Sequence, residues 1–191
     1  MTMRTTVLLR LGLLVASLSL LVGCGPRWLV VRQTVPDPLV QRPQFAVEAI
    51  RFDNLLVGGK TEGEYLAGKE QDQRGKWQAD KQAMAEGFAA ALAAAGEGLA
   101  IGPLVPEGSI VRPVVTFIEP GFYAGIAAGA TEVRMTVQIL DARGTVLDEI
   151  EVHSRIAATM GTAAVGTRLR DAADDLGHVV AGYLRTRVFP G

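Results

Sequence analysis

Apolar residues recur with two different periods along this chain, and each period predicts a different kind of element. Strict alternation is clearest over residues 133–157, on either side of an Asp141-Ala142-Arg143-Gly144 turn. We therefore predict an antiparallel hairpin with one buried and one solvated face. The inward row should hold Val133, Met135, Val137 and Ile139 on the first strand and Val146, Ile150, Val152 and Ile156 on the second. The outward row of the second strand holds Glu149, Glu151, His153 and Arg155, which we interpret as a charged solvated face.

Steps of three and four residues predict two amphipathic helices elsewhere in the chain. The first is expected over residues 76–95 and ends at Gly96, since glycine is common at helix C-termini. Its apolar stripe consists of Trp77, Met84, Phe88, Ala91, Leu92 and Ala95. The second is expected after Thr162 and runs to about Arg187, with a stripe of Val165, Leu169, Ala172, Leu176, Val180, Tyr183 and Leu184. Both stripes indicate packing in a core.

Shorter β-rich runs complete the predicted sheet. Residues 45–52 and 109–118 carry apolar side chains on both faces, which is typical of interior strands, and residues 99–101 add a short strand. Pro113 cannot donate to a ladder, so we expect it at an edge or a bulge. Residues 55–75 are rich in glycine and are expected to form a loop with one irregular helical turn. The elements together predict an α+β fold, a two-layer sandwich in which two helices pack on a mixed, mainly antiparallel sheet.

The segment from Glu119 to Ala130 has a glycine every four residues, and three interpretations of it compete. A phosphate-binding loop would need a lysine followed by serine or threonine, or a GxGxxG turn, and neither is present. A helix-packing face in a membrane would need about 20 apolar residues, and this segment is shorter. We favour a hairpin connection or a bulged strand. Its candidate residues for contact with a partner or a lipid surface are Phe122, Tyr123 and Ile126.

The first 23 residues predict a secretory signal peptide. Residues 1–10 include two arginines and no acid, and residues 11–23 form an uncharged apolar run. That run is too short for a membrane-spanning helix, which needs roughly 18 apolar residues or more. It ends in Leu21-Val22-Gly23-Cys24, which resembles the bacterial lipobox. The resemblance implies cleavage between Gly23 and Cys24, with a diacylglycerol and an N-acyl chain attached to Cys24.

A lipid-modified Cys24 would decide where the mature protein is located. Several acyl chains on one residue anchor a protein firmly, because each buried methylene contributes about 0.8 kcal/mol. Residue 25 is glycine rather than aspartate, which in lipoproteins of double-membraned bacteria implies the outer membrane. We therefore expect a lipid-anchored protein on the periplasmic face of the outer membrane.

The mature chain is expected to have two parts. Residues 24–44 contain four prolines and predict a lipid-anchored tether, and residues 45–191 form the periplasmic domain. An apolar patch at residues 28–31 is unusual for a tether. We interpret it as an extended segment that packs along the domain or lies near the headgroups, in preference to a partner-binding motif.

Composition narrows the possible partners. Removal of residues 1–23 takes away two of the 19 basic residues and none of the 20 acidic residues, so the net charge changes from −1 to −3. Nucleic acid is therefore not expected as a partner, since phosphate binding needs clustered lysine and arginine. Cys24 is the only cysteine. Acylation of its sulfur would leave no thiol for a disulfide, a nucleophile or a metal ligand.

Familiar catalytic patterns are absent from the sequence, which contains no HExxH, paired CxxC or GxSxG motif. Asp174 and His178 lie one helical turn apart and are expected to pair weakly. A metal ion would need further ligands, and His153 is the only other histidine. We therefore expect neither an enzyme nor a metal, and no cofactor besides the covalent lipid.

Several short motifs resemble a family of bacterial lipoproteins. They are Phe88-Ala-Ala-Ala-Leu92, the segment from Val137 to Leu147, and Ala181-Gly-Tyr-Leu184. Residues 45–187 are similar to a domain of unknown function that is compared with the amino-terminal TolB-like domain and the curli-secretion lipoprotein domain. The resemblance implies a non-catalytic accessory or adaptor of an envelope assembly, secretion or cell-wall complex, with an envelope protein or polymer as partner. A carrier or sensor of an apolar ligand, seated between helices and sheet, is the alternative, and a hydrolase is the least favoured function.

Overall fold

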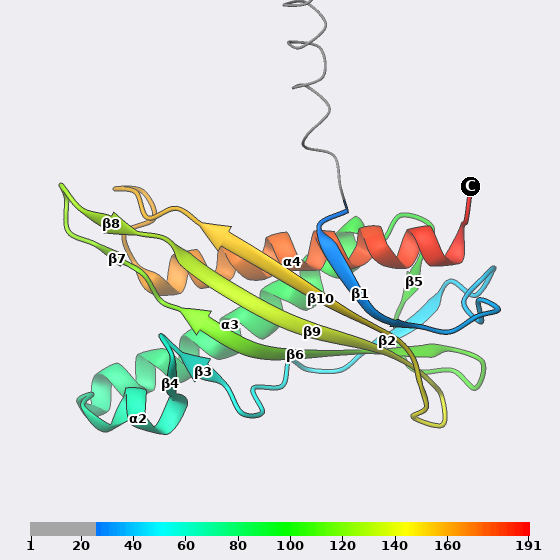
Figure 1. Ribbon diagram of the computed structural model, residues 1–191, viewed down its shortest axis with the longest axis horizontal. Helices are drawn as coiled ribbons and strands as arrows, with labels where there is room; N and C mark the ends of the chain where they lie inside the picture. The colour runs from blue at the N-terminus through cyan, green and yellow to red at the C-terminus, as the bar shows by residue number, and fades with distance from the viewer. Residues whose placement is uncertain (1–25) are drawn as a thin grey trace, which may run out of the picture.

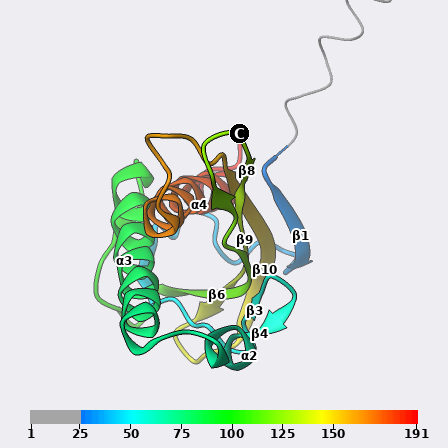
Figure 2. The same cartoon turned by 90° about the vertical axis from the view of Figure 1, so that its left-hand side faces the viewer.

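The computed structural model describes residues 26–191 as two layers, a twisted sheet and a pair of long helices (Figures 1 and 2). Helices α3 (Gln71–Ala95) and α4 (Val165–Val188) pack against each other on one face of the sheet. The predicted α+β sandwich is thus confirmed. Within residues 26–191, no helix combines the length and the apolar character needed to cross a bilayer.

Eight strands form the main sheet, and its centre is antiparallel. The antiparallel neighbours are, in order, β1 (Trp28–Gln33), β10 (Val146–Ile156), β9 (Thr131–Asp141) and β6 (Ser109–Glu119). On the other side of β6, β2 (Gln44–Val47) and then β5 (Ala100–Ile101) add in parallel. β3 (Leu56–Val57) runs parallel to the far end of β6 and pairs with β4 (Lys60–Thr61). The three longest strands therefore lie together and support both long helices.

The predicted hairpin and helices lie close to where the periodicity placed them. Strands β9 and β10 turn the expected valines, isoleucines and Met135 inward with one exception, Val146, which is half-buried and lies beyond a β-bulge that shifts its pairing to Leu140. The inward row of β10 also includes Asp148 and Ser154, both buried. Helix α4 matches its predicted range. Helix α3 begins five residues earlier than predicted, because the Gln73 side chain accepts a hydrogen bond from the Glu70 backbone N–H at 3.1 Å and caps an additional polar turn.

The layer between the helices and the sheet is filled by side chains. Met84, Phe88 and Leu92 of α3 and Leu176 of α4 are at most 1% exposed and belong to one apolar cluster. The helices approach each other closely at Gly177, where an added Cβ would lie 2.8 Å from the Phe88 carbonyl oxygen. The space that an apolar-ligand carrier would use for its ligand is therefore occupied by core packing.

The segment predicted as a tether belongs largely to the fold. Residues 28–33 form β1, an edge strand paired antiparallel with β10. Trp28 packs edge-on against Tyr183 of α4, with 5.7 Å between the ring centroids. The prediction of a tether over residues 24–44 is therefore wrong from Trp28 onward, and the fold begins before residue 45. The prolines that suggested a tether flank this strand and do not interrupt it.

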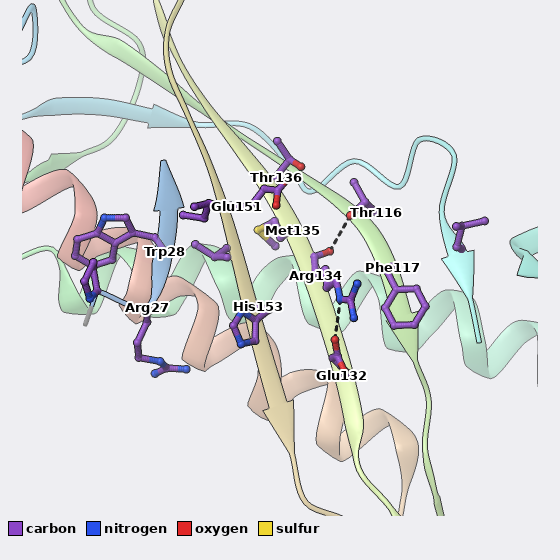
Figure 3. Close-up of a pocket in the computed structure, with 14 residues that line it drawn as sticks. Arg27, Trp28, Thr116, Phe117, Glu132, Arg134, Met135, Thr136, Glu151 and His153 are labelled. Atoms are coloured by element: carbon purple, nitrogen blue, oxygen red, sulfur yellow. Dashed lines mark hydrogen bonds and ion pairs between the residues drawn. The ribbon is translucent and has the colours of Figure 1, made fainter. Parts of the chain in front are cut away.

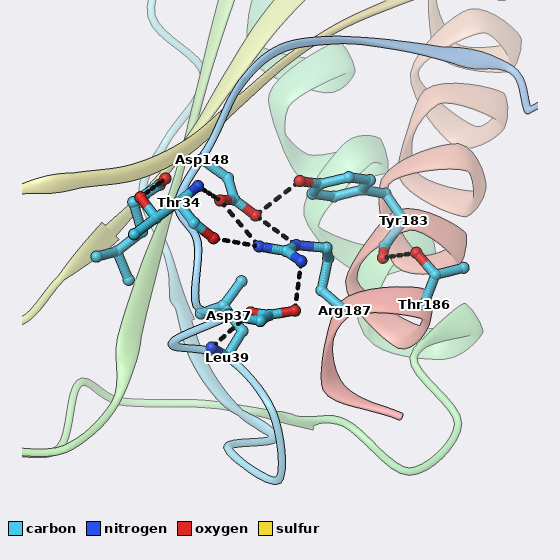
Figure 4. Close-up of polar contacts among 8 residues, drawn as sticks. Thr34, Asp37, Leu39, Asp148, Tyr183, Thr186 and Arg187 are labelled. Carbon is cyan, nitrogen blue, oxygen red and sulfur yellow. Dashed lines mark hydrogen bonds and ion pairs between the residues drawn. The ribbon is translucent and has the colours of Figure 1, made fainter. Parts of the chain in front are cut away.

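A buried polar cluster fixes the loop that follows β1 (Figure 4). The Asp148 carboxylate is fully buried and accepts hydrogen bonds from Tyr183 Oη and Arg187 Nε, both at 2.7 Å. The backbone N–H of Thr34 donates to the same carboxylate at 3.1 Å, and Arg187 also pairs with Asp37. Burial, together with the Asp148 carboxylate, raises the pKa of Tyr183. The loop is therefore held against the C-terminal end of α4.

Residues 55–75 contain more regular structure than the predicted loop. The β3–β4 turn uses Gly58 and Gly59, both with positive φ, and helix α2 (Glu62–Ala67) follows at once. Thr61 caps this helix: its Oγ1 accepts from the Glu64 backbone N–H at 3.3 Å, and the Glu64 carboxylate accepts from the Thr61 N–H at 2.9 Å. We predicted a loop here because glycine is frequent in this segment, and a capping box made of polar residues does not appear in a hydrophobic pattern.

Pro113 lies in the interior of the sheet rather than at an edge or a bulge. On one side it is paired with Val137 of β9. On the other side the neighbouring strand is interrupted, because β2 ends at Val47 and β3 begins at Leu56. In that interval the Arg51 N–H donates to the Pro113 carbonyl at 3.0 Å. The proline is tolerated because its missing N–H faces the interruption.

Candidate functional site

A groove of about 790 Å³ crosses the face of the sheet that α3 and α4 leave open (Figure 3). It extends from the start of β1 over β10 and β9 to β6. The outward row predicted for β10 contributes Glu151 and His153 to it. Its other side chains include Arg27, Leu29, Thr116, Phe117, Glu132, Arg134 and Thr136. Outward residues of four strands therefore form one continuous surface.

Two of the charged side chains in the groove, Arg134 and Glu132, form an ion pair with each other. Arg134 Nε donates to Glu132 Oε1 at 2.7 Å, and its guanidinium lies over the Phe117 ring, 4.9 Å from the centroid. Within the part of the chain that the structure describes, His153 makes no hydrogen bond to a hydroxyl or a carboxylate. An activated nucleophile would need such a contact to a base.

A clamp between Arg27 and α4 closes one end of the groove. Arg27 Nη1 and Nη2 donate to the two carboxylate oxygens of Asp175 at 2.7 and 2.6 Å, and Ser154 Oγ donates to the same carboxylate at 2.6 Å. The hydrogen bonds from Arg27 lower the pKa of Asp175 and raise that of Arg27. A bidentate pair of this kind fixes both side chains in orientation. The chain is thus held to the domain from Arg27 onward.

The glycine-rich segment forms a small hairpin of β7 (Phe122–Tyr123) and β8 (Ala128–Gly129). Gly121 has a φ of +62°, and an added Cβ there would lie 2.3 Å from the Gly129 carbonyl oxygen. Gly125 adopts positive φ in the turn, and a Cβ on Gly129 would lie 2.9 Å from the Phe122 ring. Each of the three glycines is therefore required by the backbone conformation or by a close contact. The favoured interpretation, a hairpin connection, agrees with the structure.

A buried arginine holds this hairpin against the loop that joins β10 to α4. Arg168 is fully buried; its Nε donates to Thr131 Oγ1 at 2.7 Å and its Nη2 to the Pro120 carbonyl at 3.0 Å. Its Nη1 donates to the carbonyls of Thr162 and Ala163, both at 2.6 Å. Among the described residues, no carboxylate pairs with Arg168, and burial lowers its pKa. One guanidinium thus fixes two neighbouring loops.

The three candidate residues of the hairpin differ in exposure. Ile126 is fully exposed at the turn, Phe122 is 56% exposed, and Tyr123 is half-buried. The loop fixed by the same arginine carries Met160, which is 84% exposed. An apolar surface larger than the predicted hairpin tip is therefore present at this end of the domain.

Other residues predicted from the sequence fall outside the groove. Gly23 and Cys24, the cleavage and lipidation residues, lie outside the described residues. Asp174 and His178 pair across one turn of α4, with 3.6 Å between Oδ2 and Nδ1, and both are mostly exposed. Residues 26–191 contain no cluster of three histidine or carboxylate side chains that would hold a metal ion.

Comparison with known proteins shows a similarity of fold only. No family model and no curated protein sequence matches the chain. The structure is similar to PelC from Paraburkholderia phytofirmans, solved as a dodecamer, with 12% identity over 80% of this chain and 96% of that one and a TM-score of 0.43. It is also similar to a minor lipoprotein from Acinetobacter baumannii, with 13% identity over 76% and 92% of the chains and a TM-score of 0.41. Similar solved structures thus include a bacterial lipoprotein, but likenesses this distant carry no argument about activity.

Sequence reasoning did not find Arg27, Arg134 or Arg168 as site residues. The alternating pattern of β9 identifies Arg134 as an outward residue. Its place in the groove, however, depends on α3 and α4 leaving that face of the sheet open. Arg168 carried a local signal, since it directly precedes Leu169 of the apolar stripe. Nothing local predicted the pairing of Arg27 with Asp175, because 148 positions separate the two residues.

Proposed function

We propose that the protein is a lipid-anchored, non-catalytic accessory of the bacterial cell envelope that binds a partner protein or polymer in the groove on its open sheet face. The observation that carries this proposal is the groove itself. It lies across β1, β10, β9 and β6, on the face opposite the two helices, and two of its charged side chains, Arg134 and Arg27, are held by carboxylates.

The lining of the groove suits a chain of low net charge. Arg134 pairs with Glu132 and Arg27 pairs with Asp175 of α4, so among the described residues only Glu151 adds an uncompensated charge to the lining. Phe117 and Leu29 offer apolar surface. The hydroxyls of Thr116 and Thr136 add hydrogen-bonding capacity. A mixed lining with one uncompensated negative charge favours an extended polypeptide or a polar polymer over a polyanion.

Because β1 belongs to the fold, the link between the lipid and the domain is shorter than the predicted tether. If Cys24 is acylated, only Gly25 and Pro26 separate it from Arg27, which is clamped to α4. Three residues span at most about 10 Å when fully extended. The anchor would therefore hold the domain directly at the membrane surface, instead of allowing it to sample a wide radius.

A photocrosslinking experiment in the native host membrane tests the groove. A photoreactive amino acid replaces Glu151 in the groove or, as a matched control, Glu86 on the exposed side of α3. We expect a reproducible crosslinked protein or polymer from position 151 and none from position 86. The same product from both positions, or from neither, contradicts the proposed groove.

Mass spectrometry of the mature N-terminal peptide tests the anchor separately. We expect Cys24 to carry a diacylglycerol and an N-acyl chain, and Cys24→Ala to leave the membrane fraction. An unmodified Cys24 in the native protein contradicts the lipid anchor without affecting the groove.

A further inference from the structure

Four exposed apolar side chains belong to segments on the side of the molecule where β1 begins. In Figures 1 and 2 the β7–β8 turn, the loop joining β10 to α4, the C-terminus and the start of β1 all lie along the same, upper side. These segments carry exposed Phe122, Ile126, Met160 and Phe189. We call these four residues the apolar side. Its members come from three separate stretches of chain, so no single local sequence pattern produces it.

The most protruding part of the apolar side is held in place by buried contacts. Arg168 bonds the carbonyls of Pro120, Thr162 and Ala163, which lie at the bases of the hairpin and of the neighbouring loop. The Phe122 ring lies against Gly129. Ile126 and Met160 are therefore presented in fixed positions, whereas apolar side chains on loose loops would collapse onto the domain.

The described chain begins on this same side, and Cys24 precedes its first residue by two positions in the sequence. The structure begins at Pro26, and Arg27 is fixed to Asp175 of α4, a helix that runs along the upper side in both views. Only Gly25 stands between Cys24 and Pro26 in the sequence. A lipid on Cys24 therefore places the bilayer next to the apolar side and away from the far end of β1.

We infer that the apolar side docks on the bilayer that holds the Cys24 lipid, with Ile126 and Met160 entering the boundary between headgroups and acyl chains. This inference rests on the lipid anchor of the proposed function. Apolar residues at such a boundary are typically buried by about 5–10 Å. The docked orientation leaves the groove facing sideways, where a partner can reach it.

Apolar contact rather than charge drives this docking. The exposed positions of α4 carry Arg170 and His178 as well as Asp171 and Asp174, so this face offers no excess of positive charge to attract anionic headgroups. Zwitterionic lipid is therefore sufficient as the docking surface. Ile126 and Met160, far more exposed than Phe189, supply the main contacts.

The test uses the mature, acylated protein in vesicles of phosphatidylethanolamine and phosphatidylcholine. Cys24 is the only cysteine and its sulfur is acylated in this form, so an introduced cysteine is the only free thiol. An environment-sensitive fluorophore is attached to Ile126→Cys, to Met160→Cys or, as a control, to Val35→Cys. Val35 is 85% exposed and follows the far end of β1.

We expect blue-shifted emission and quenching by bromine-labelled acyl chains at positions 126 and 160, and water-like emission at position 35. Water-like emission at all three positions of a protein whose acylation is confirmed by mass overturns the docking inference and leaves the groove proposal intact. Emission that shifts only after native membrane proteins are added assigns the apolar side to a protein partner and also overturns the inference.

Discussion

Asp148 and Arg187 form an ion pair that is buried where β10 meets the C-terminal end of α4, with 2.7 Å between Oδ2 and Nε. Removal of the Asp148 charge leaves Arg187 with Asp37 as its remaining charged partner. We expect Asp148→Asn to lower the free energy of unfolding by about 3 kcal/mol, the usual cost of breaking a buried pair. Tyr183→Phe, which removes one hydrogen bond to the same carboxylate, should cost about 1.5 kcal/mol. Urea unfolding followed by tryptophan fluorescence measures both, and equal losses would contradict the dominant role of the ion pair.

The contact between Gly177 and α3 gives a second prediction. A Cβ at position 177 would lie 2.8 Å from the Phe88 carbonyl oxygen and 2.9 Å from the Leu92 nitrogen, both backbone atoms that cannot move alone. Gly177→Ala should therefore force the helices apart and lower the free energy of unfolding by about 2–3 kcal/mol.

Gly182 in the same helix is the matched control. An added Cβ there would meet only the Trp28 ring, at an ordinary 3.6 Å. Gly182→Ala should raise the free energy of unfolding by about 0.5–1 kcal/mol, since alanine has the higher helix propensity. Similar effects of the two substitutions would show that the close approach at Gly177 is not limiting.

The periodic parts of the fold were predictable from the sequence. Helix α4 and the β9–β10 hairpin each bury one complete face, so apolar spacing alone located them. Strand β1 was not predictable in this way, because it is an edge strand whose Leu29, Val30 and Val31 remain exposed. Its place in the sheet depends on pairing with β10, more than 100 residues away, and that pairing leaves no local pattern.

The candidate site was predictable only in part. The glycine spacing pointed to the hairpin and to Ile126, and the alternation of β10 identified Glu151 and His153 as outward residues. The groove also needs neighbours on β1, β9 and β6, which the strand order brings together. Buried polar residues were missed for a related reason: the side-chain partners of Asp148, and half of the hydrogen-bond partners of Arg168, are distant in sequence. A hydrophobic pattern treats such charged residues as surface residues.

The pKa of Asp175 predicts an acid-sensitive clamp. Hydrogen bonds from Arg27 lower the folded-state pKa of this carboxyl below its unfolded value, which is about 3.9. An acid whose pKa falls on folding adds stability above its unfolded pKa, and that stability is lost as the pH falls through the folded pKa. Because Arg27 is half exposed, we expect Asp175→Asn to cost about 1 kcal/mol at pH 7.

The pH dependence distinguishes the clamp from a general packing effect. The difference in unfolding free energy between the native protein and Asp175→Asn should shrink steadily as the pH falls below about 4, where the unfolded carboxyl takes up a proton. Asp174→Asn, at the exposed neighbouring position, is the control and should have little effect at any pH. A difference for Asp175→Asn that stays constant with pH would mean that the charge on Asp175 does not stabilise the clamp.

Arg168 links the two loops of the apolar side, and its replacement should loosen them before the rest of the domain. In Arg168→Met the carbonyls of Thr162 and Ala163 lose their donor, so we expect a loss of about 2 kcal/mol in unfolding free energy. Arg168→Lys keeps the charge but not the planar fork of donors, and should recover only part of this loss. Amide hydrogen exchange by mass spectrometry should show faster exchange in residues 120–131 and 157–164, with α3 unchanged. Uniformly faster exchange throughout the domain would show that Arg168 supports the core as a whole and does not specifically hold the two loops.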